Sequence, residues 1–138
     1  MIDNLEAAEL PSHGTSRGRN ITLWVLQGVL ALVFVLTALL KFTGSPQAVA
    51  VFEAMGTAGW LPYVIGVLEV AGAVALLIPR LSGLAAVAFV ALMVGAVLTH
   101  LIWGGPVVLE IVLLILCVVV AYGRRSATSE LLTGLGQR

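Results

Sequence analysis

Long apolar runs, separated by short polar or glycine-rich stretches, account for most of this chain. Four of them stand out, at residues 21–40, 61–79, 81–103 and 106–122. A helix needs about 20 predominantly apolar residues to cross the hydrocarbon core of a bilayer, with a range of about 17–25. The pattern therefore predicts an all-α fold, namely an integral membrane four-helix bundle over residues 21–123.

The segments at the two ends of the chain predict tails. We expect residues 1–20 to be a flexible cytoplasmic tail, because they lack a sustained apolar face, and residues 124–138 to be a second cytoplasmic tail. The run at 21–40 is longer than the apolar region of a signal peptide, which has about 7–15 residues. No clear small-residue cleavage site follows this run, so we interpret it as a retained first span.

The long connection at residues 44–60 carries the signals of a short helix. Ser45 is a residue type that caps helices, Pro46 suits the first helical position, and Gly56 can end a helix. The apolar positions between them share one face: Ala48, Val49, Val51, Phe52 and Met55. We expect a short helix at the outer membrane interface that covers the bundle, with Glu53 on its solvated side.

Composition and charge strengthen the membrane assignment and orient it. Hydrophobic residues make up 60% of the 138 residues and charged residues only 10%, against roughly 25% in soluble domains. Mean hydropathy is +1.11. The formal net charge is zero, so charge offers no reason to expect a nucleic-acid partner, and we expect none. The expected partner is the lipid bilayer, and the expected location is the cell membrane, as a multi-pass protein.

Basic and aromatic residues are distributed asymmetrically over the four runs. One side of a four-span arrangement receives six arginines: Arg17, Arg19, Arg80, Arg124, Arg125 and Arg138. Lys41 alone falls on the other side. Because cytoplasmic loops are enriched in basic residues, we expect both termini in the cytoplasm. Aromatic rings prefer the headgroup level, and they fall near the span ends: Trp24 and Tyr122 on the inner side, Trp60, Tyr63 and Trp103 on the outer side.

Four ionisable residues interrupt the apolar runs or stand at their ends: Lys41, Glu69, His100 and Glu110. An ionisable group inside a membrane is expensive and is a functional-site candidate by default. With a rise of about 1.5 Å per residue and about 15 Å for half the hydrocarbon, all four fall in the outer half. We therefore predict that they converge on one pocket as candidate catalytic residues.

Small and polar residues predict how the helices pack. Gln27, Phe34 and Lys41 are spaced by seven and share a face, to which Thr37 belongs; a polar residue there can equally well bond to a neighbouring helix. Glu69 shares its face with small residues, so we expect it to point into the bundle: Gly66, Gly72 and Ala73. A second stripe predicts close helix packing: Ala91, Gly95 and Thr99. The single cysteine, Cys117, excludes an internal dithiol and is expected to be buried.

Two interpretations of the four ionisable residues remain open. Protonated Lys41 and His100 balance two ionised carboxylates, and such a cluster can share a mobile proton, as in proton relays. Alternatively, the charged side chains pair with one another and only fix the helices relative to one another. We predict no metal site, because neither Glu-x-x-His nor His-x-x-x-His spacing accompanies His100.

Four segments resemble the DoxX family, in particular its short DoxX-like branch. They are ALLKFTGSP (38–46), GWLP (59–62), GVLEVAGAVALLIPRLSGLAA (66–86) and GAVLTHL (95–101), and the resemblance extends over about residues 21–123. It implies a four-helix membrane fold and marks Lys41, Glu69 and His100; Glu110 is added from its position alone. Some members of the family are subunits of thiosulfate:quinone oxidoreductase, and others belong to oxidative-stress complexes or to methylamine-dehydrogenase maturation.

Three functions are therefore compatible with the sequence. The first is a membrane subunit of a quinone-linked redox system, in which Glu69 and His100 handle protons, Lys41 stabilises a developing oxyanion, and a redox partner protein or a bound quinol supplies electrons. The second is an acid–base enzyme, such as an isomerase or an epoxide-opening enzyme, acting on a lipophilic substrate. The third is a membrane scaffold without enzymatic activity.

Overall fold

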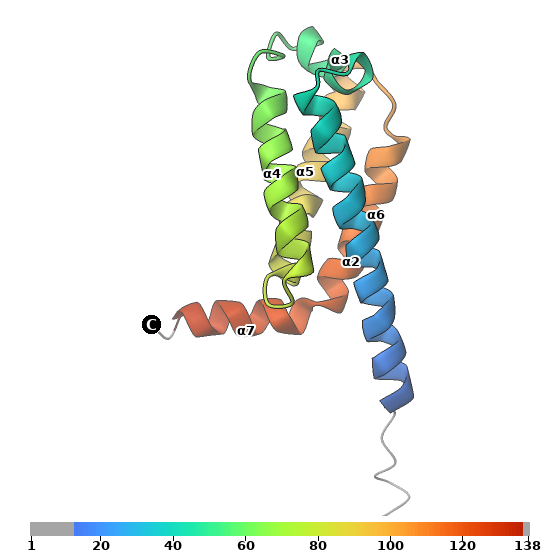
Figure 1. Ribbon diagram of the computed structural model, residues 1–138, viewed down its shortest axis with the longest axis vertical. Helices are drawn as coiled ribbons and strands as arrows, with labels where there is room; N and C mark the ends of the chain where they lie inside the picture. Colours follow the sequence, from blue (N-terminus) through green and yellow to red (C-terminus); the bar gives the residue numbers. More distant parts are fainter. Residues whose placement is uncertain (1–12, 137–138) are drawn as a thin grey trace, which may run out of the picture.

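The computed structural model describes residues 13–136, which form six helices and no strand. The helices are α2 (His13–Phe42), α3 (Pro46–Ala54), α4 (Leu61–Leu77), α5 (Ser82–Trp103), α6 (Val108–Gly123) and α7 (Arg125–Gly136). In Figure 1, α2, α4, α5 and α6 run up and down along the long axis, α3 crosses the upper end, and α7 lies across the lower end. The all-α prediction is confirmed, and the four apolar runs coincide with the four long-axis helices.

The helices differ from the predicted ones chiefly at two starts and in one additional helix. Helix α2 begins at His13, within the segment expected to be a tail, because a helix can continue past the apolar residues that mark a span. Helix α6 begins at Val108, two residues after the predicted start, and follows a turn in which Gly104 and Gly105 hold positive φ angles of 89° and 139°. Helix α7 was not predicted. The remainder of the expected amino-terminal tail, residues 1–12, and Arg138 lie outside the described residues.

The bundle is built from two helix pairs. The largest interfaces join α2 to α4 and α5 to α6. A stack of Phe34 and Phe89, with ring centroids 3.7 Å apart and planes 2° apart, joins the two pairs. Gly72 lies against the ring of Phe89, and a Cβ there would overlap the ring. The small residues predicted on the Glu69 face therefore do allow close packing, and Cys117 is fully buried in the same core, as expected.

A polar network at the α7 end holds α2, α4 and α6 together. The buried amide of Gln27 donates to the carbonyl of Leu76 at 2.6 Å and accepts from Nε of Arg124 at 2.8 Å. Nη1 of Arg124 donates to Oδ1 of Asn20 at 2.9 Å. Burial, followed by the positive charge of Arg19, lowers the pKa of Arg124 from its ordinary value. The network confirms the interpretation of Gln27 as a bond to a neighbouring helix.

The lateral surface of the bundle is apolar. Two helices are long and apolar enough to cross a membrane, Arg17–Phe42 and Ser82–Trp103, and two shorter apolar helices accompany them, Leu61–Leu77 and Val108–Gly123. Only 22% of the most apolar window of Ser82–Trp103 is buried within the protein. Large apolar side chains therefore face outward in a number that a water-soluble surface rarely carries.

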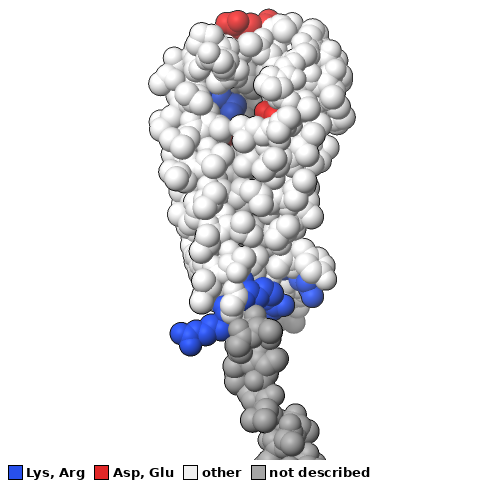
Figure 2. Space-filling model, turned by 90° about the vertical axis from the view of Figure 1, so that its right-hand side faces the viewer, with Lys and Arg blue, Asp and Glu red and all other residues white. Residues whose placement is uncertain are grey.

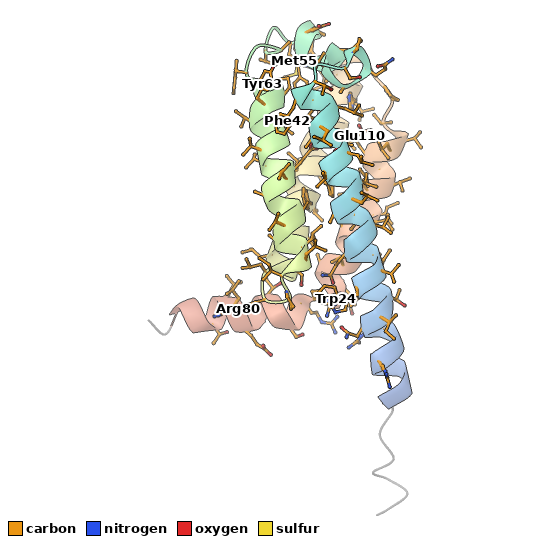
Figure 3. All side chains as sticks on the ribbon, in the orientation of Figure 1. Trp24, Phe42, Met55, Tyr63, Arg80 and Glu110 are labelled. Atoms are coloured by element: carbon orange, nitrogen blue, oxygen red, sulfur yellow. The ribbon has the colours of Figure 1, made fainter. Side chains whose placement is uncertain are left out.

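Charged and aromatic side chains gather at the two ends. In Figure 2, blue side chains surround the lower end, while the middle of the visible face is white. Figure 3 places Trp24 and Arg80 near the α7 end, and Tyr63 and Met55 near the α3 end. This distribution agrees with the separation of arginines from Lys41 in the sequence. A bilayer that covers the apolar middle would have its headgroups at these two levels.

Helix α3 covers the upper end of the bundle as the sequence predicted. It begins at Pro46 and buries Val49 and Phe52, while Glu53 is exposed. Gly56, at φ 74°, lies just beyond its carboxyl end. Ser45 occupies the capping position, but its hydroxyl bonds to Oε1 of Gln47 at 3.0 Å instead of capping the helix. The capping role expected of Ser45 is therefore wrong, although the helix it precedes is confirmed.

Candidate functional site

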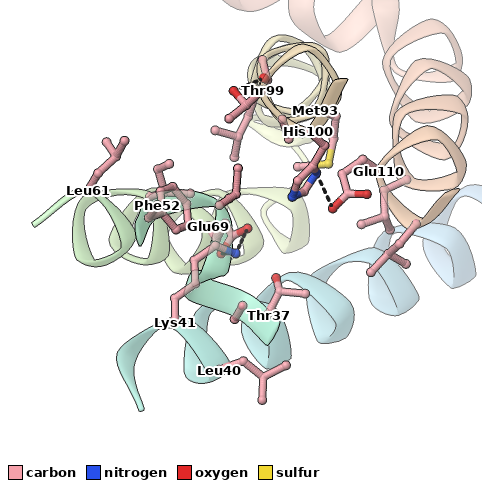
Figure 4. Close-up of a pocket in the computed structure, with 18 of the residues that line it drawn as sticks. Thr37, Leu40, Lys41, Phe52, Leu61, Glu69, Met93, Thr99, His100 and Glu110 are labelled. Carbon is pink, nitrogen blue, oxygen red and sulfur yellow. Dashed lines mark hydrogen bonds and ion pairs between the residues drawn. The ribbon is translucent and has the colours of Figure 1, made fainter. Parts of the chain in front are cut away.

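A cavity of about 490 Å³ lies between the two helix pairs, under α3. All four ionisable residues singled out in the sequence line it: Lys41 from α2, Glu69 from α4, His100 from α5 and Glu110 from α6. Figure 4 shows these four side chains converging on one space, with Phe52 from α3 beside them. Most of the other lining residues are apolar, among them Ile65, Met93 and Leu113. The structure thus brings together all of the predicted site residues.

The first ion pair joins α2 to α4 on one wall of the cavity. Nζ of Lys41 donates to Oε1 of Glu69 at 3.0 Å and to Oε2 at 3.1 Å. The side chain of Glu69 is 3% exposed and that of Lys41 is 14% exposed. Because an ammonium group has three donors, these two bonds leave one N–H of Lys41 for another acceptor.

The second ion pair joins α5 to α6 on the opposite wall and is looser. Nδ1 of His100 lies 3.4 Å from Oε1 of Glu110, and the side chains are 18% and 17% exposed. Nδ1 of His100 and Oε2 of Glu110 are buried atoms that make no hydrogen bond within the described residues. Buried polar atoms are rarely left unpaired, so this pair has unused hydrogen-bonding capacity at the cavity.

A glycine holds the imidazole of His100 in place. Gly105 has a φ of 139°, and a Cβ built on it would lie 2.6 Å from Cδ2 of His100. The backbone between α5 and α6 therefore packs directly on the ring, which only a residue without a side chain permits. The sequence analysis did not predict this contact, although two consecutive glycines close to a candidate histidine are a usable signal.

The cavity lies between the two helix pairs, and we call it the slot. Each ion pair lies within one helix pair, so neither crosses the slot. Below the slot, the Phe34–Phe89 stack joins the two pairs one helical turn beyond Met93. Above it, α3 contributes Val51 and Phe52 to the lining. A flat molecule entering the slot would meet one ion pair on each side and apolar side chains above and below.

One expected packing stripe proves to have a different position. Ala91, Gly95 and Thr99 were predicted to pack against a neighbouring helix, but all three line the cavity. Ala91 and Gly95 are exposed, and nothing lies within 4 Å of a Cβ built at Gly95. Small residues suit both close packing and an open crevice, and the rotation of α5 about its axis decides between the two. The close packing expected here is therefore wrong.

The side chains of the site do not form a cluster of metal ligands. Among residues 13–136, no three His, Cys, Asp or Glu side chains are close enough together to hold a metal ion. The cavity lining instead combines apolar walls with two cation–carboxylate pairs.

The model of the DoxX-like family matches residues 25–122 of this chain. The chain belongs to the DoxX-like family. The match spans α4 and α5 completely, nearly all of α6 and the apolar part of α2, so it includes every residue of the candidate site. No curated protein and no solved structure matches the chain. Family membership and the apolar helices together indicate a membrane protein.

Proposed function

We propose that this DoxX-like protein is a membrane subunit of a quinone-linked redox system, and that the slot binds the quinone ring. The observation that carries the proposal is the pair of ion pairs on opposite walls of one largely apolar cavity. Pockets for small molecules typically have about 300–1,000 Å³, mostly apolar walls and a few placed polar groups. A quinone has two carbonyl oxygens on opposite edges of a flat apolar ring, which suits such a slot.

The two ion pairs would act differently on the ring. The third N–H of Lys41 is available to one ring oxygen and would stabilise negative charge that develops there. On the other wall, the imidazole of His100 would exchange a proton with the second oxygen, with Glu110 stabilising the imidazolium. Because both oxygens of Glu69 are bound to Lys41, we assign Glu69 to the positioning of Lys41 and the proton exchange to His100.

The reaction balance defines what the chain must obtain from elsewhere. Reduction of a quinone to a quinol takes up two electrons and two protons. The residues of the slot handle protons only, so the electrons would come from a redox partner protein or, in the reverse direction, leave to one. We propose that four helices cross the membrane with both termini in the cytoplasm, which places the slot in the outer half of the bilayer.

The proposal is tested by what copurifies with the protein. Mass spectrometry of lipid extracts from detergent-purified wild type should detect quinone in near-stoichiometric amount. Ala96→Phe places a ring in the cavity, since Ala96 lines it, and should abolish copurification. The control Ala71→Phe alters an exposed position on α4 outside the lining and should retain the quinone. Equal quinone in all three proteins, or none in wild type, would refute the proposal.

A second function is favoured by one specific observation. The unpaired Nδ1 of His100 and Oε2 of Glu110 could serve an acid–base enzyme acting on a lipophilic substrate without any electron transfer. In that case the compound retained by wild type and lost in Ala96→Phe would be an epoxide, a ketone or another non-quinone lipid. The same extracts therefore distinguish the two functions.

A further inference from the structure

Exposed residues of the cavity lining fall into two sets at different depths along the bundle. Residues that line the cavity and are also exposed mark where it opens. One set is Leu40, Gln47, Pro106 and Leu109, where α2 and α6 face each other. The other set is Ala91 and Gly95 on α5, in a lining to which α4 contributes the half-buried Ile65. The helices that border these openings, α2 with α6 and α4 with α5, share the smaller interfaces of the bundle.

The first opening is shallow. Leu40 is two residues from the end of α2, and Leu109 is the second residue of α6, so both lie within one turn of the α3 end. Figure 2 shows the hollow near the upper end of this face, with blue and red side chains visible inside it. Lys41, the single lysine of the chain, is a lining residue of the cavity. Gln47 and Pro106 on the rim place this opening close to the headgroup level.

The second opening reaches much deeper. Along α5 its exposed lining residues run from Gly95 to Ala91, four residues, or about 6 Å at 1.5 Å per residue. Ala91 is twelve residues from the end of α5 at Trp103, about 18 Å. With half the hydrocarbon at about 15 Å, the lower part of this opening faces the centre of the bilayer, where only lipid chains are present.

We propose that the opening between α4 and α5 holds the hydrocarbon tail of the bound ligand, whose head group lies in the slot, and that Gly95 keeps this path open. The proposal rests on the proposed function for the identity of the ring. It adds that the ligand is a long-chain lipid entering from the bilayer. The space around Gly95 supports it, because a Cβ there would meet no atom within 4 Å although the residue lines the cavity.

The depth of the two openings separates their roles. A tail leaving by the shallow opening would emerge among headgroups, where burying its methylene groups gains nothing. Each methylene kept in hydrocarbon or against apolar side chains is worth about 0.8 kcal/mol. The tail therefore leaves by the deep opening, and the shallow opening is left for water and protons to reach Lys41 and the His100–Glu110 pair.

The test compares a quinone with and without a tail on variants with a matched control. The probes are a dimethoxy-methyl-benzoquinone and the same ring with a decyl chain, titrated in one detergent by the quenching of tryptophan fluorescence. Gly95→Leu fills the opening, and Ala91→Leu fills its lower end. Gly28→Leu makes the same change at an exposed glycine of α2 that also has nothing within 4 Å and lies outside the lining. Leucine has a higher helix propensity than glycine, so the two Gly→Leu changes are compatible with their helices.

In wild type and Gly28→Leu, the decyl compound should bind more tightly than the tailless ring. Gly95→Leu should lower the affinity for the decyl compound about tenfold, as expected when roughly two methylenes are displaced. Its affinity for the tailless ring should change less than twofold. Ala91→Leu should change the two affinities in the same direction. Three results would overturn the tail path alone. Gly95→Leu could lower the affinity for both probes equally or leave both affinities unchanged, or wild type could bind the decyl compound no more tightly than the tailless ring. Failure of wild type to bind either probe refutes the proposed function as well.

Discussion

The ion pair of Lys41 and Glu69 allows the structural and functional contributions of the site to be separated. We consider the variants Lys41→Met and Glu69→Gln, alone and together. Each single change leaves one charged group without its partner between α2 and α4. The double change replaces the pair by a thioether chain and an amide of similar size, so no uncompensated charge remains.

The geometry sets the expected magnitudes. Breaking a buried pair by removing one partner costs about 3–5 kcal/mol, and the two bonds of 3.0 and 3.1 Å identify this pair as strongly coupled. Lys41→Met should reach that range, because Glu69 is 3% exposed and its short side chain cannot reach water. Glu69→Gln should cost less, about 2–3 kcal/mol, because the long lysine side chain at the end of α2 can turn toward the headgroups. The double variant should lose only about 1–2 kcal/mol.

The assay is reversible unfolding in mixed micelles, followed by circular dichroism. The coupling free energy from the double-mutant cycle should be at least about 3 kcal/mol. Glu53→Gln, an exposed position on α3, is the matched control and should change stability by no more than about 0.5 kcal/mol. The double variant should also lose the copurifying quinone, since it lacks the lysine donor. If the protein is instead a scaffold and the ion pair is purely structural, the double variant should keep its partner proteins.

Additive effects of the two single changes, with a coupling below about 0.5 kcal/mol, would refute the buried ion pair. If the double variant is stable and still retains quinone in full amount, the ion pair has a structural role only, and Lys41 does not contact the ligand.

Three further predictions concern the rest of the molecule. Gly105→Ala should displace the ring of His100, weaken quinone binding and destabilise the fold by about 1–3 kcal/mol, measured by the same titration and unfolding assays. Gln27→Leu should cost about 1–3 kcal/mol of unfolding free energy, because it leaves buried partners on α4 and α6 without their bonds. In intact cells, an impermeant thiol reagent should label Ala54→Cys and should label Thr133→Cys only after permeabilisation.

Each of these predictions has a control or a contradicting result. Gly104→Ala adds a methyl at a positive φ but meets no neighbour, so it should cost strain energy without loss of quinone binding. Thr22→Val removes an exposed bond within α2 and should be nearly neutral beside Gln27→Leu. Cys117 is fully buried and should not react; labelling of Thr133→Cys in intact cells, with Ala54→Cys protected, would reverse the proposed orientation.

The sequence predicts the helices and the convergence of the four ionisable residues well, because both depend on hydropathy and on axial position. A charged group in an apolar run must face the bundle, and counting residues gives its height. Rotation about the helix axis is harder to predict. Small residues at Ala91, Gly95 and Thr99 fit a packed interface as well as a crevice, and only the placement of α4 beside α5 distinguishes them.

Features that depend on pairs of distant groups can be predicted only in part. The pairing within the site, Lys41 with Glu69 and His100 with Glu110, follows from which helices are neighbours, and the residue types alone allow other pairings. The bond between Gln27 and Arg124 joins residues 97 positions apart in the chain. Helix α7 was not predicted because its polar and apolar residues average to a low hydropathy, although Leu131 is buried.

Photoaffinity labelling shows directly whether a quinone ring occupies the slot between the two helix pairs. A decyl-benzoquinone with a photoreactive group on the ring should crosslink to slot residues such as Met93 and Leu113, as located by peptide mass spectrometry. Unlabelled quinone should suppress these crosslinks, and Ala96→Phe should abolish them while Ala71→Phe does not. Crosslinks confined to lipid-facing residues outside the slot, and insensitive to competitor and to Ala96→Phe, would contradict quinone binding in the slot.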